Sequence, residues 1–292
     1  MKTRAQTDTS KTSARSSLGV LAVLGKYTVV IAAVLLYISP IMFMIVGSIK
    51  PDAKVLAEAG TLRAFVPTAA TMRNYLDVFR RVDFSRFMLN SLFITGTIVG
   101  VGLVANAMAG YAFARLRWRG RSLCFVFVLS LMILPFEAIA VPLFYQITLF
   151  GWRDTYTAQI VPFIANAFGI YLFYTFFNGL PPELEEAART DGAGVMRTFV
   201  EIIVPNAKPV FATVAIITFL MYWGFFLWPL MVTSGPEVRP LPVAIANFHT
   251  LPPLKWGDIM AFGVMMVAPV LIVFLAFQRW FVRGVASAGV KG

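Results

Sequence analysis

Acidic side chains, which can form ion pairs and take part in proton transfer, gather in one part of this chain. Five of its 14 acidic residues lie between Pro181 and Pro209: Glu183, Glu185, Glu186, Asp191 and Glu201. The protein is 59% hydrophobic, so a charged stretch of this length is unusual in it. So organised a polar loop favours a surface against which a partner protein docks. The alternative is a solvated helical hairpin that contacts no partner.

Few other residues could carry chemistry. His249 is the only histidine and Cys124 the only cysteine, so neither a multi-histidine metal site nor a Cys/His zinc cluster can form. Gly100-Val-Gly102-Leu-Val-Ala105 matches a dinucleotide fingerprint in letters, but it lies in an apolar run rather than after a strand. The stretch from Gly19 to Tyr27 fails as a phosphate loop, because Tyr27 stands where Ser or Thr is needed. We therefore predict no metal, no bound cofactor and no enzymatic activity in this chain.

A short helix should position the acidic residues at the start of the loop. Pro182 suits the first helical position, and the glutamates that follow favour the positive N-terminal end. Glu185 and Arg189 can pair at i,i+4. Asp191-Gly192 interrupts the helix, with Gly192 able to adopt a left-handed backbone conformation.

A second helix is expected over residues 195–203. Its apolar face would pack on the rest of the protein, and Pro205 would end it. That face consists of Val195, Phe199, Ile202 and Ile203.

The composition outside this loop is that of a polytopic membrane protein. The mean hydropathy is +0.77, and only 13% of the residues are charged. The net charge of +11 does not indicate nucleic-acid binding, because the basic residues gather at the ends of apolar segments rather than in a basic stripe.

A bilayer core needs about 20 apolar residues per helix. Six stretches qualify: roughly 27–48, 89–113, 122–147, 157–178, 209–232 and 259–281. The predicted fold class is therefore all-α, a polytopic membrane protein with six transmembrane helices and the acidic loop after the fourth span. Residues 1–26 are rich in Ser, Thr, Lys and Arg and are predicted to form a disordered tail, and residues 285–292 a second tail.

Orientation follows from the positive-inside rule. The short loop 115–121 contains four arginines and no acidic residue, and both chain ends are also basic. These segments are expected in the cytoplasm, which places both termini and the loop 181–209 there. The long loop 49–88 would then lie outside.

Glu137 is the one charged residue deep within a predicted span. An ionisable group there costs a few kcal/mol or more unless it faces a cavity or a partner. It lies between Pro135 and Pro142, which should break or bend the helix. It is either a residue of a translocation pathway or gate, or a protonated or hydrogen-bonded glutamate that holds the kink or lies near the outer interface.

Other polar and aromatic residues in the predicted spans are weaker pathway candidates. Helix-to-helix hydrogen bonding accounts for most such amides, and interfacial anchoring for most such aromatic rings. Aromatic faces also suit stacking against sugar rings. The candidates are Asn106, Asn166, Gln278, Tyr222, Trp223 and Trp228.

The spacing of residues in the acidic loop resembles the signature loop of ABC importer permeases. That signature consists of Glu186-Ala187-Ala188, Gly192, Ile202 and Pro205, with Val204 where the family usually has Leu. Other stretches resemble the carbohydrate-importer branch, and the similarity covers nearly everything after residue 26. They are Ser48-Ile49-Lys50-Pro51, Asn74-Tyr75, Asn90-Ser91, Trp223 with Trp228-Pro229-Leu230, and the ending from Gln278 to Gly292.

The resemblance implies a heteromeric importer in the cytoplasmic (inner) membrane of a bacterium or archaeon. A permease of this kind pairs with a second related permease, two ATPase subunits that hold ATP and Mg, and an extracytoplasmic solute-binding protein. Residues 27–284 would form the transmembrane domain, and the loop 181–209 would couple it to an ATPase. The resemblance assigns the coupling role to Glu186, Ala187, Ala188, Asp191, Gly192, Ile202 and Pro205. The cargo would be a sugar or a related polyol, moved by alternating access.

Three alternatives have different signatures. An importer of the same class could carry a non-sugar solute. A secondary transporter would be expected to show internal repeats and more intramembrane charge. A membrane-embedded enzyme needs a catalytic constellation, which one His, one Cys and one intramembrane carboxylate do not supply.

Overall fold

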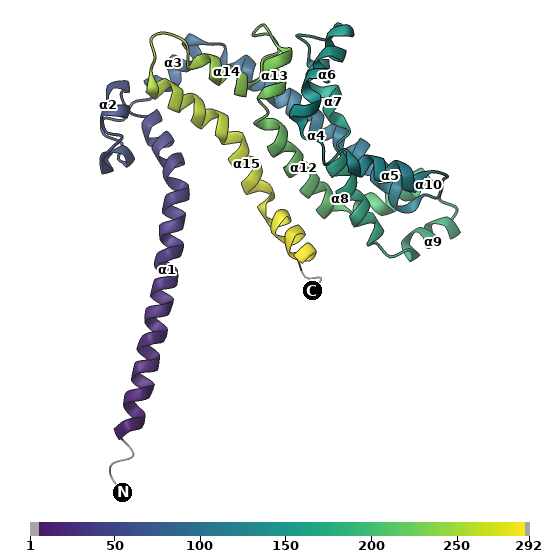
Figure 1. The fold of residues 1–292 in the computed structure, drawn as a ribbon, viewed down its shortest axis with the longest axis horizontal. Coiled ribbons are helices and arrows are strands. Elements are labelled where there is room, and N and C mark those ends of the chain that lie inside the picture. The colour runs from purple at the N-terminus through teal and green to yellow at the C-terminus, as the bar shows by residue number, and fades with distance from the viewer. Residues whose placement is uncertain (1–5, 290–292) are drawn as a thin grey trace. The chain divides into compact units, whose positions relative to one another are not determined.

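The computed structural model describes the backbone of residues 6–289 and the side chains of residues 23–277 (Figure 1). Within these residues the regular elements are helices, with no β-strand, as the predicted all-α class requires. The chain forms two compact units. Unit 1 comprises Met1–Leu76 and Lys255–Val264, and unit 2 comprises Asp77–Leu254 and Met265–Gly292.

Unit 1 is built around a long helix, α1 (Gln6–Ser48). α1 begins at Gln6, so the helix of the apolar segment extends back into the stretch 1–26, for which the sequence predicts a disordered tail. Each residue added to an existing helix gains one backbone hydrogen bond, so propagation costs little. At the other end, α15 (Trp256–Gly289) continues into the stretch 285–292, for which a second tail is predicted. Residues 1–5 and 290–292 lie outside the described residues.

A buried lysine organises the segment after α1, which contains α2 (Asp52–Ala57) and η1 (Leu62–Phe65). The Lys50 Nζ donates to Glu58 Oε2 at 2.9 Å and to the carbonyl oxygens of Arg63 and Ala64. The hydrogen bond from Lys50 is the main cause that lowers the pKa of the Glu58 carboxyl. A buried charge is tolerated when its hydrogen bonds are satisfied, so Lys50 fixes the path of this segment.

The same segment is tied to α3 (Arg73–Arg81). The Asn74 Nδ2 donates to the carbonyl oxygens of Ser48 at 2.8 Å and Lys50 at 2.7 Å. The Tyr75 hydroxyl lies 2.8 Å from Ser48 Oγ. The motif residues at 48–51 and 74–75 therefore meet at the end of α1.

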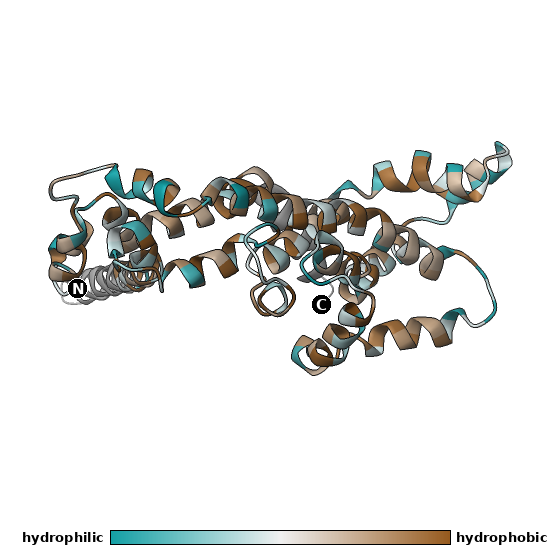
Figure 2. Cartoon of the chain, turned by 90° about the horizontal axis from the view of Figure 1, so that it is seen from above, coloured by the Kyte–Doolittle hydropathy of each residue, from teal (hydrophilic) through white to brown (hydrophobic). Residues whose placement is uncertain are grey.

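Unit 2 is a helical bundle in which α4, α8 and α12 pack against one another (Figure 1). Hydrophobic residues cover most of its helical turns, and hydrophilic residues gather in the connecting loops (Figure 2). Its helices are α4 (Phe84–Arg115), α5 (Arg121–Ser130), α6 (Phe136–Leu149), α7 (Tyr156–Ile164), α8 (Ala167–Asn178), α9 (Glu183–Thr190), α10 (Val195–Thr198), the π-helix η2 (Phe199–Ile203), α11 (Val204–Asn206), α12 (Lys208–Trp223), α13 (Leu227–Val232) and α14 (Leu241–Phe248).

The predicted spans are only partly continuous helices. Within the described residues, four segments are long and apolar enough to cross a membrane: Val23–Ser48, Phe84–Arg115, Tyr156–Asn178 and Trp256–Phe277. A fifth is reached if Val195–Asn206 and Lys208–Trp223, which meet at 80°, count as one span. Length and composition therefore do not establish the predicted six spans.

Two predicted spans are interrupted for local reasons. The span 122–147 divides into α5 and α6 before Pro135, which has no N–H to continue a helix. The span 209–232 divides into α12 and α13, with Gly224 ending the first helix. Glycine is common at such ends because it leaves a helix at little cost.

Glycines set the distance between α4 and α8. A Cβ built on Gly110 would lie 2.5 Å from Phe173 Cβ and 3.0 Å from Tyr174 N. One on Gly102 would lie 3.0 Å from the Ile164 carbonyl oxygen. At Gly96 and Gly100, by contrast, an added Cβ would meet open space.

The Gly110→Ala variant should therefore be destabilised by about 1–3 kcal/mol, because the added methyl group forces α4 and α8 apart. Gly100→Ala on the same helix is the matched control and should be neutral or slightly stabilising. Thermal unfolding in detergent measures both. Equal stability of the two variants would contradict the close contact.

Candidate functional site

The helix α9 has the start and end that its sequence predicted. Pro182 immediately precedes its first residue, and three glutamates occupy its first turn. At its other end Gly192 has φ = +77°. The Gly192 N–H donates to the Arg189 carbonyl, and the Ala193 N–H donates to the Ala188 carbonyl at 2.9 Å. This pair of bonds is the Schellman motif, which satisfies the last carbonyl groups of the helix.

The signature residues divide between two faces of α9. Glu186 and Ala187 are exposed, as are Asp191 and Gly192. Ala188, in contrast, is buried and packs inward. The exposed residues thus combine two carboxylates with small residues that allow another backbone to approach.

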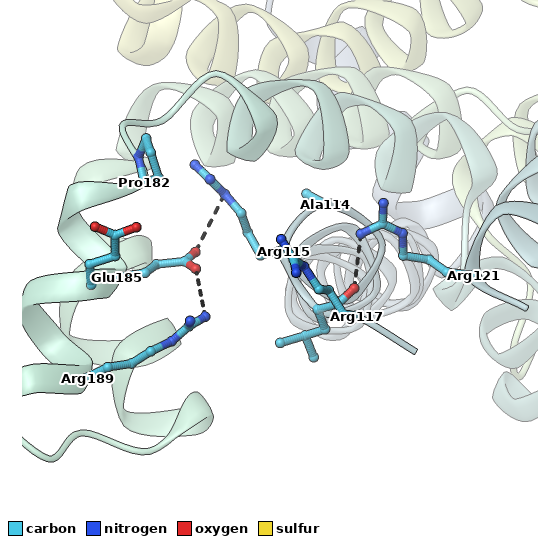
Figure 3. Close-up of a pocket in the computed structure, with 9 residues that line it drawn as sticks. Ala114, Arg115, Arg117, Arg121, Pro182, Glu185 and Arg189 are labelled. Carbon is cyan, nitrogen blue, oxygen red and sulfur yellow. Dashed lines mark hydrogen bonds and ion pairs between the residues drawn. The ribbon is translucent and has the colours of Figure 1, made fainter. Parts of the chain in front are cut away.

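Glu185 is buried, unlike Glu186, and its carboxylate points toward the end of α4 (Figure 3). Its side chain is only 7% exposed, and its Oε1 lies 3.5 Å from Arg115 Nε. Its Oε2 lies 3.6 Å from Arg189 Nη2, which confirms the predicted i,i+4 pair. The Arg115 Nη2 also donates to the Leu180 carbonyl oxygen. Arg115 was missed as a site residue because its basic run indicated only membrane orientation.

An open, polar cleft of about 640 Å³ lies beside this ion-pair cluster. It holds four arginines and two glutamates but no nucleophile with an adjacent base, so its chemistry is ion pairing. Its lining consists of Ala114, Arg115, Leu116, Arg117, Arg121, Pro182, Glu185, Glu186 and Arg189.

The second half of the loop packs into the core of unit 2. The predicted helix over 195–203 is present as α10 and η2, but it continues through Pro205 to Asn206. Pro205 lacks the N–H that would bond the Glu201 carbonyl, which accounts for the wide π-helical turn before it. Phe199 and Ile203 are buried with Tyr111, Phe173 and Phe177.

The remaining residues of that predicted face bury less surface. Ile202 is only partly buried, and Val195 is 55% exposed rather than packed. The loop is therefore held mainly through η2.

Three pathway candidates meet where the span Tyr156–Asn178 is broken between α7 and α8. Asn106, buried on α4, donates from Nδ2 to the Ile164 carbonyl at 3.2 Å and accepts the Asn166 N–H at 2.9 Å. The Asn166 side chain caps α8 by accepting the Gly169 N–H at 3.0 Å. Its Nδ2 donates to the Tyr222 hydroxyl at 3.4 Å. These amides thus satisfy the backbone groups that the break exposes.

The two tryptophan candidates are buried in the bundle. The Trp223 Nε1 donates to the Met266 carbonyl at 3.0 Å, and the Trp228 Nε1 donates to the Ala158 carbonyl at 2.9 Å. Trp228 is 0% exposed and packs against Phe136 and Phe163. Both indoles hold helices together in this conformation.

Glu137 is not placed deep within a continuous span. It lies in the first turn of α6, after the break that Pro135 causes, and it is exposed. A carboxylate in a first turn is favoured by the helix dipole. The Gln278 side chain lies outside the described side chains.

At the opposite end of α4, two polar residues hold a loop. Asn90 Nδ2 donates to the carbonyl oxygens of Glu237 and Arg239, both at 2.9 Å. The Leu241 N–H donates to Ser91 Oγ at 2.8 Å. The motif Asn90-Ser91 therefore anchors the segment between α13 and α14.

No group of three or more His, Cys, Asp and Glu side chains suited to a metal ion occurs in the part of the chain that the structure describes.

Comparisons with known proteins agree along most of the chain. Residues 98–287 match the family described as "Binding-protein-dependent transport system inner membrane component". The arabinooligosaccharides transport system permease protein AraQ of Halalkalibacterium halodurans is 34% identical over 254 residues, which cover 87% of this chain and 91% of that protein. The trehalose/maltose transport system permease protein MalG of Thermococcus litoralis is 30% identical, with 92% and 98% covered. The sn-glycerol-3-phosphate transport system permease protein UgpE of Yersinia pestis is 30% identical, with 90% and 95% covered.

A solved structure has the same fold. A chain in the crystal structure of a bacterial ABC transporter involved in the import of the acidic polysaccharide alginate superposes with a TM-score of 0.76 at 24% identity. The match covers 96% of this chain and 99% of that one.

Proposed function

The chain belongs to the family of binding-protein-dependent transport system inner membrane components, and from this we propose that it is the permease subunit of an ATP-driven sugar importer. The observation that carries the proposal is the similarity of nearly the whole chain to permease proteins of arabinooligosaccharide, trehalose/maltose and glycerol-phosphate transport systems. The cargo is a sugar or related polyol, moved across the membrane by alternating access. A secondary transporter is not favoured by these relatives.

In the proposed complex this chain pairs with a second related permease, two ATPase subunits and an extracytoplasmic solute-binding protein. ATP and Mg bind to the ATPases. The exposed face of α9, with Glu186, Ala187, Asp191 and Gly192, docks on an ATPase. Ala188 and Ile202 support that face from within the loop, because Ala188 is buried and Ile202 lies in η2, which packs on the bundle. Pro205 is exposed and shapes the π-helical turn before it.

The proposed topology is six spans in the inner membrane of a bacterium or archaeon, with both termini in the cytoplasm. α5 with α6 would form one span and α12 with α13 another, since each pair together has the length that a bilayer requires. The arginine-rich loop 115–121 and α9 then share the cytoplasmic side. The ion pair between Arg115 and Glu185 supports their lying on one side of the membrane.

The break between α7 and α8 is the proposed position of the translocation pathway. Irregular backbone inside a membrane domain is tolerated where it is buried in protein or lines a cavity, and broken helices form the substrate sites of many transporters. Asn106, Asn166 and Tyr222 supply amide and hydroxyl groups there that suit a polyhydroxylated solute. Trp223, Trp228 and Glu137 would border the pathway in other conformations.

Co-purification through a tag on this chain tests the docking role. In cells that also express the second permease and the ATPase, Glu186→Arg should reduce the bound ATPase about tenfold or more, as loss of a central interface residue does. Glu237→Arg makes the same charge change on an exposed residue at the other end of unit 2 and should leave the ATPase bound.

Uptake into proteoliposomes tests the transport function. The complete complex and its binding protein should accumulate at least one of a panel of oligosaccharides, trehalose, maltose and sn-glycerol 3-phosphate, and only with ATP. Accumulation without any ATPase subunit would contradict the proposal and favour a secondary transporter.

A further inference from the structure

We propose that α4 is a lever that carries motion of α9 through unit 2, and that the ion pair between Arg115 and Glu185 attaches α9 to it. This role rests on the docking function proposed for α9. It gives Glu185 and Arg115 positioning roles that are separate from the contact of Glu186 with an ATPase.

The attachment is well suited to transmit force. Glu185 and Arg115 side chains are only 7% and 13% exposed, so their attraction is screened far less than that of a surface pair. Arg115 also donates to the Leu180 carbonyl, in the connection between α8 and α9. One guanidinium therefore holds both α9 and the residues that lead into it.

Adjacent glutamates thus have different neighbours. On a helix, consecutive side chains point about 100° apart. Glu186 is exposed, whereas Glu185 is buried and faces Arg115 on α4 (Figure 3). A partner that moves Glu186 would move Glu185, and Arg115 with it, because both glutamates lie on one short rigid helix.

α4 has the continuity that a lever needs. It runs from Phe84 to Arg115 without a proline, about 48 Å at 1.5 Å per residue. By contrast, the apolar segments beside it are interrupted between α7 and α8 and between α12 and α13.

Two further attachments lie along the same helix. Asn106 holds both sides of the break between α7 and α8. Asn90 and Ser91 hold the loop between α13 and α14. Displacement of the Arg115 end would therefore act on the proposed pathway and on the far loop together, through packed side chains and hydrogen bonds.

Charge variants in the full complex test the attachment. Glu185→Gln and Arg115→Gln should each lower the solute transported per ATP hydrolysed about tenfold, within the usual range of coupling between sites. The amount of bound ATPase should not change. The double exchange Arg115→Glu with Glu185→Arg should restore part of the ratio, because a carboxylate and a guanidinium again face each other, while the bond to the Leu180 carbonyl stays lost. The proposed lever would be contradicted if both single variants transported as much solute per ATP hydrolysed as the native protein. It would also be contradicted if an exchange variant that assembles recovered none of this ratio.

Cross-linking provides a second test that does not depend on removing charge. Cys124 is exposed and is replaced by serine first. The two thiols of the variant Arg115→Cys with Glu185→Cys are then joined by a short bifunctional thiol reagent. A lever should transport after cross-linking at a rate above that of the unlinked cysteine pair, since the covalent link replaces the ion pair. Loss of transport on cross-linking would show that α9 must move relative to α4.

Two variants distinguish the docking function of α9 from the lever role of α4. If Glu186→Arg leaves the ATPase bound, the docking function of α9 is wrong. If Glu186→Arg releases the ATPase but Glu185→Gln transports with full efficiency, docking stands and only the lever is wrong.

Discussion

Gly192→Val is expected to abolish ATP-driven uptake while the protein still inserts into the membrane. Gly192 has φ = +77°, a conformation that costs an L-residue about 1–2 kcal/mol and a β-branched residue more. A Cβ at this position meets no atom within 4 Å, so the cause is backbone strain rather than a clash within this chain. The strain would break the Schellman motif and displace the docking face of α9. Uptake and ATPase co-purification measure the effect.

Two variants distinguish the effect of backbone conformation at position 192 from the effect of side-chain size. Gly192→Asn should retain most of the uptake, because asparagine adopts left-handed geometry far more readily than valine. Gly194→Val adds the same side chain two residues away, where the backbone is extended and the space is open. It should behave as the native protein. Equal loss from Gly192→Asn and Gly192→Val would point to bulk at the ATPase contact instead.

Asn106→Leu is expected to prevent assembly of a functional transporter. Leucine has a similar size, but it can neither donate to the Ile164 carbonyl nor accept the Asn166 N–H. Each unsatisfied buried group costs about 1–3 kcal/mol, so the two together threaten the stability of the domain. Thermal unfolding in detergent should show the loss first, and uptake should be absent.

The matched control is Asn178→Leu, at the exposed last residue of α8. It should retain native stability and uptake. A stable Asn106→Leu protein would mean that the break between α7 and α8 does not depend on this amide.

Local sequence patterns predicted the local structure well. The helix at 183–190 and the left-handed Gly192 follow from proline, glutamate and glycine preferences within a dozen residues. The interruption near Glu137 follows from Pro135 in the same way. By contrast, a run of apolar residues does not show whether one helix or two will form. Hydropathy alone therefore supports neither a continuous helix over 122–147 nor the predicted total of six spans.

The candidate site depends on contacts that a single sequence does not show. Arg115 and Glu185 are 70 positions apart, and Asn106 and Asn166 are 60 apart. Each of the four residues has an ordinary local explanation, as an orientation signal, a helix-terminal charge or a polar residue in a span. These residues become pairs only because α4 packs against the loop 181–209 and against the broken span Tyr156–Asn178.

The ion pair between α4 and α9 also limits how such permeases can be recombined. The loop 181–209 looks like a portable module, because its signature spacing lies within one contiguous segment. Glu185, however, finds its counter-charge outside that segment, at the end of α4. A chimera that receives this loop without an arginine at the position of Arg115 would carry a nearly buried carboxylate with only Arg189 to neutralise it. Loops exchanged between permeases should therefore be matched to the end of the preceding long helix as well as to the ATPase.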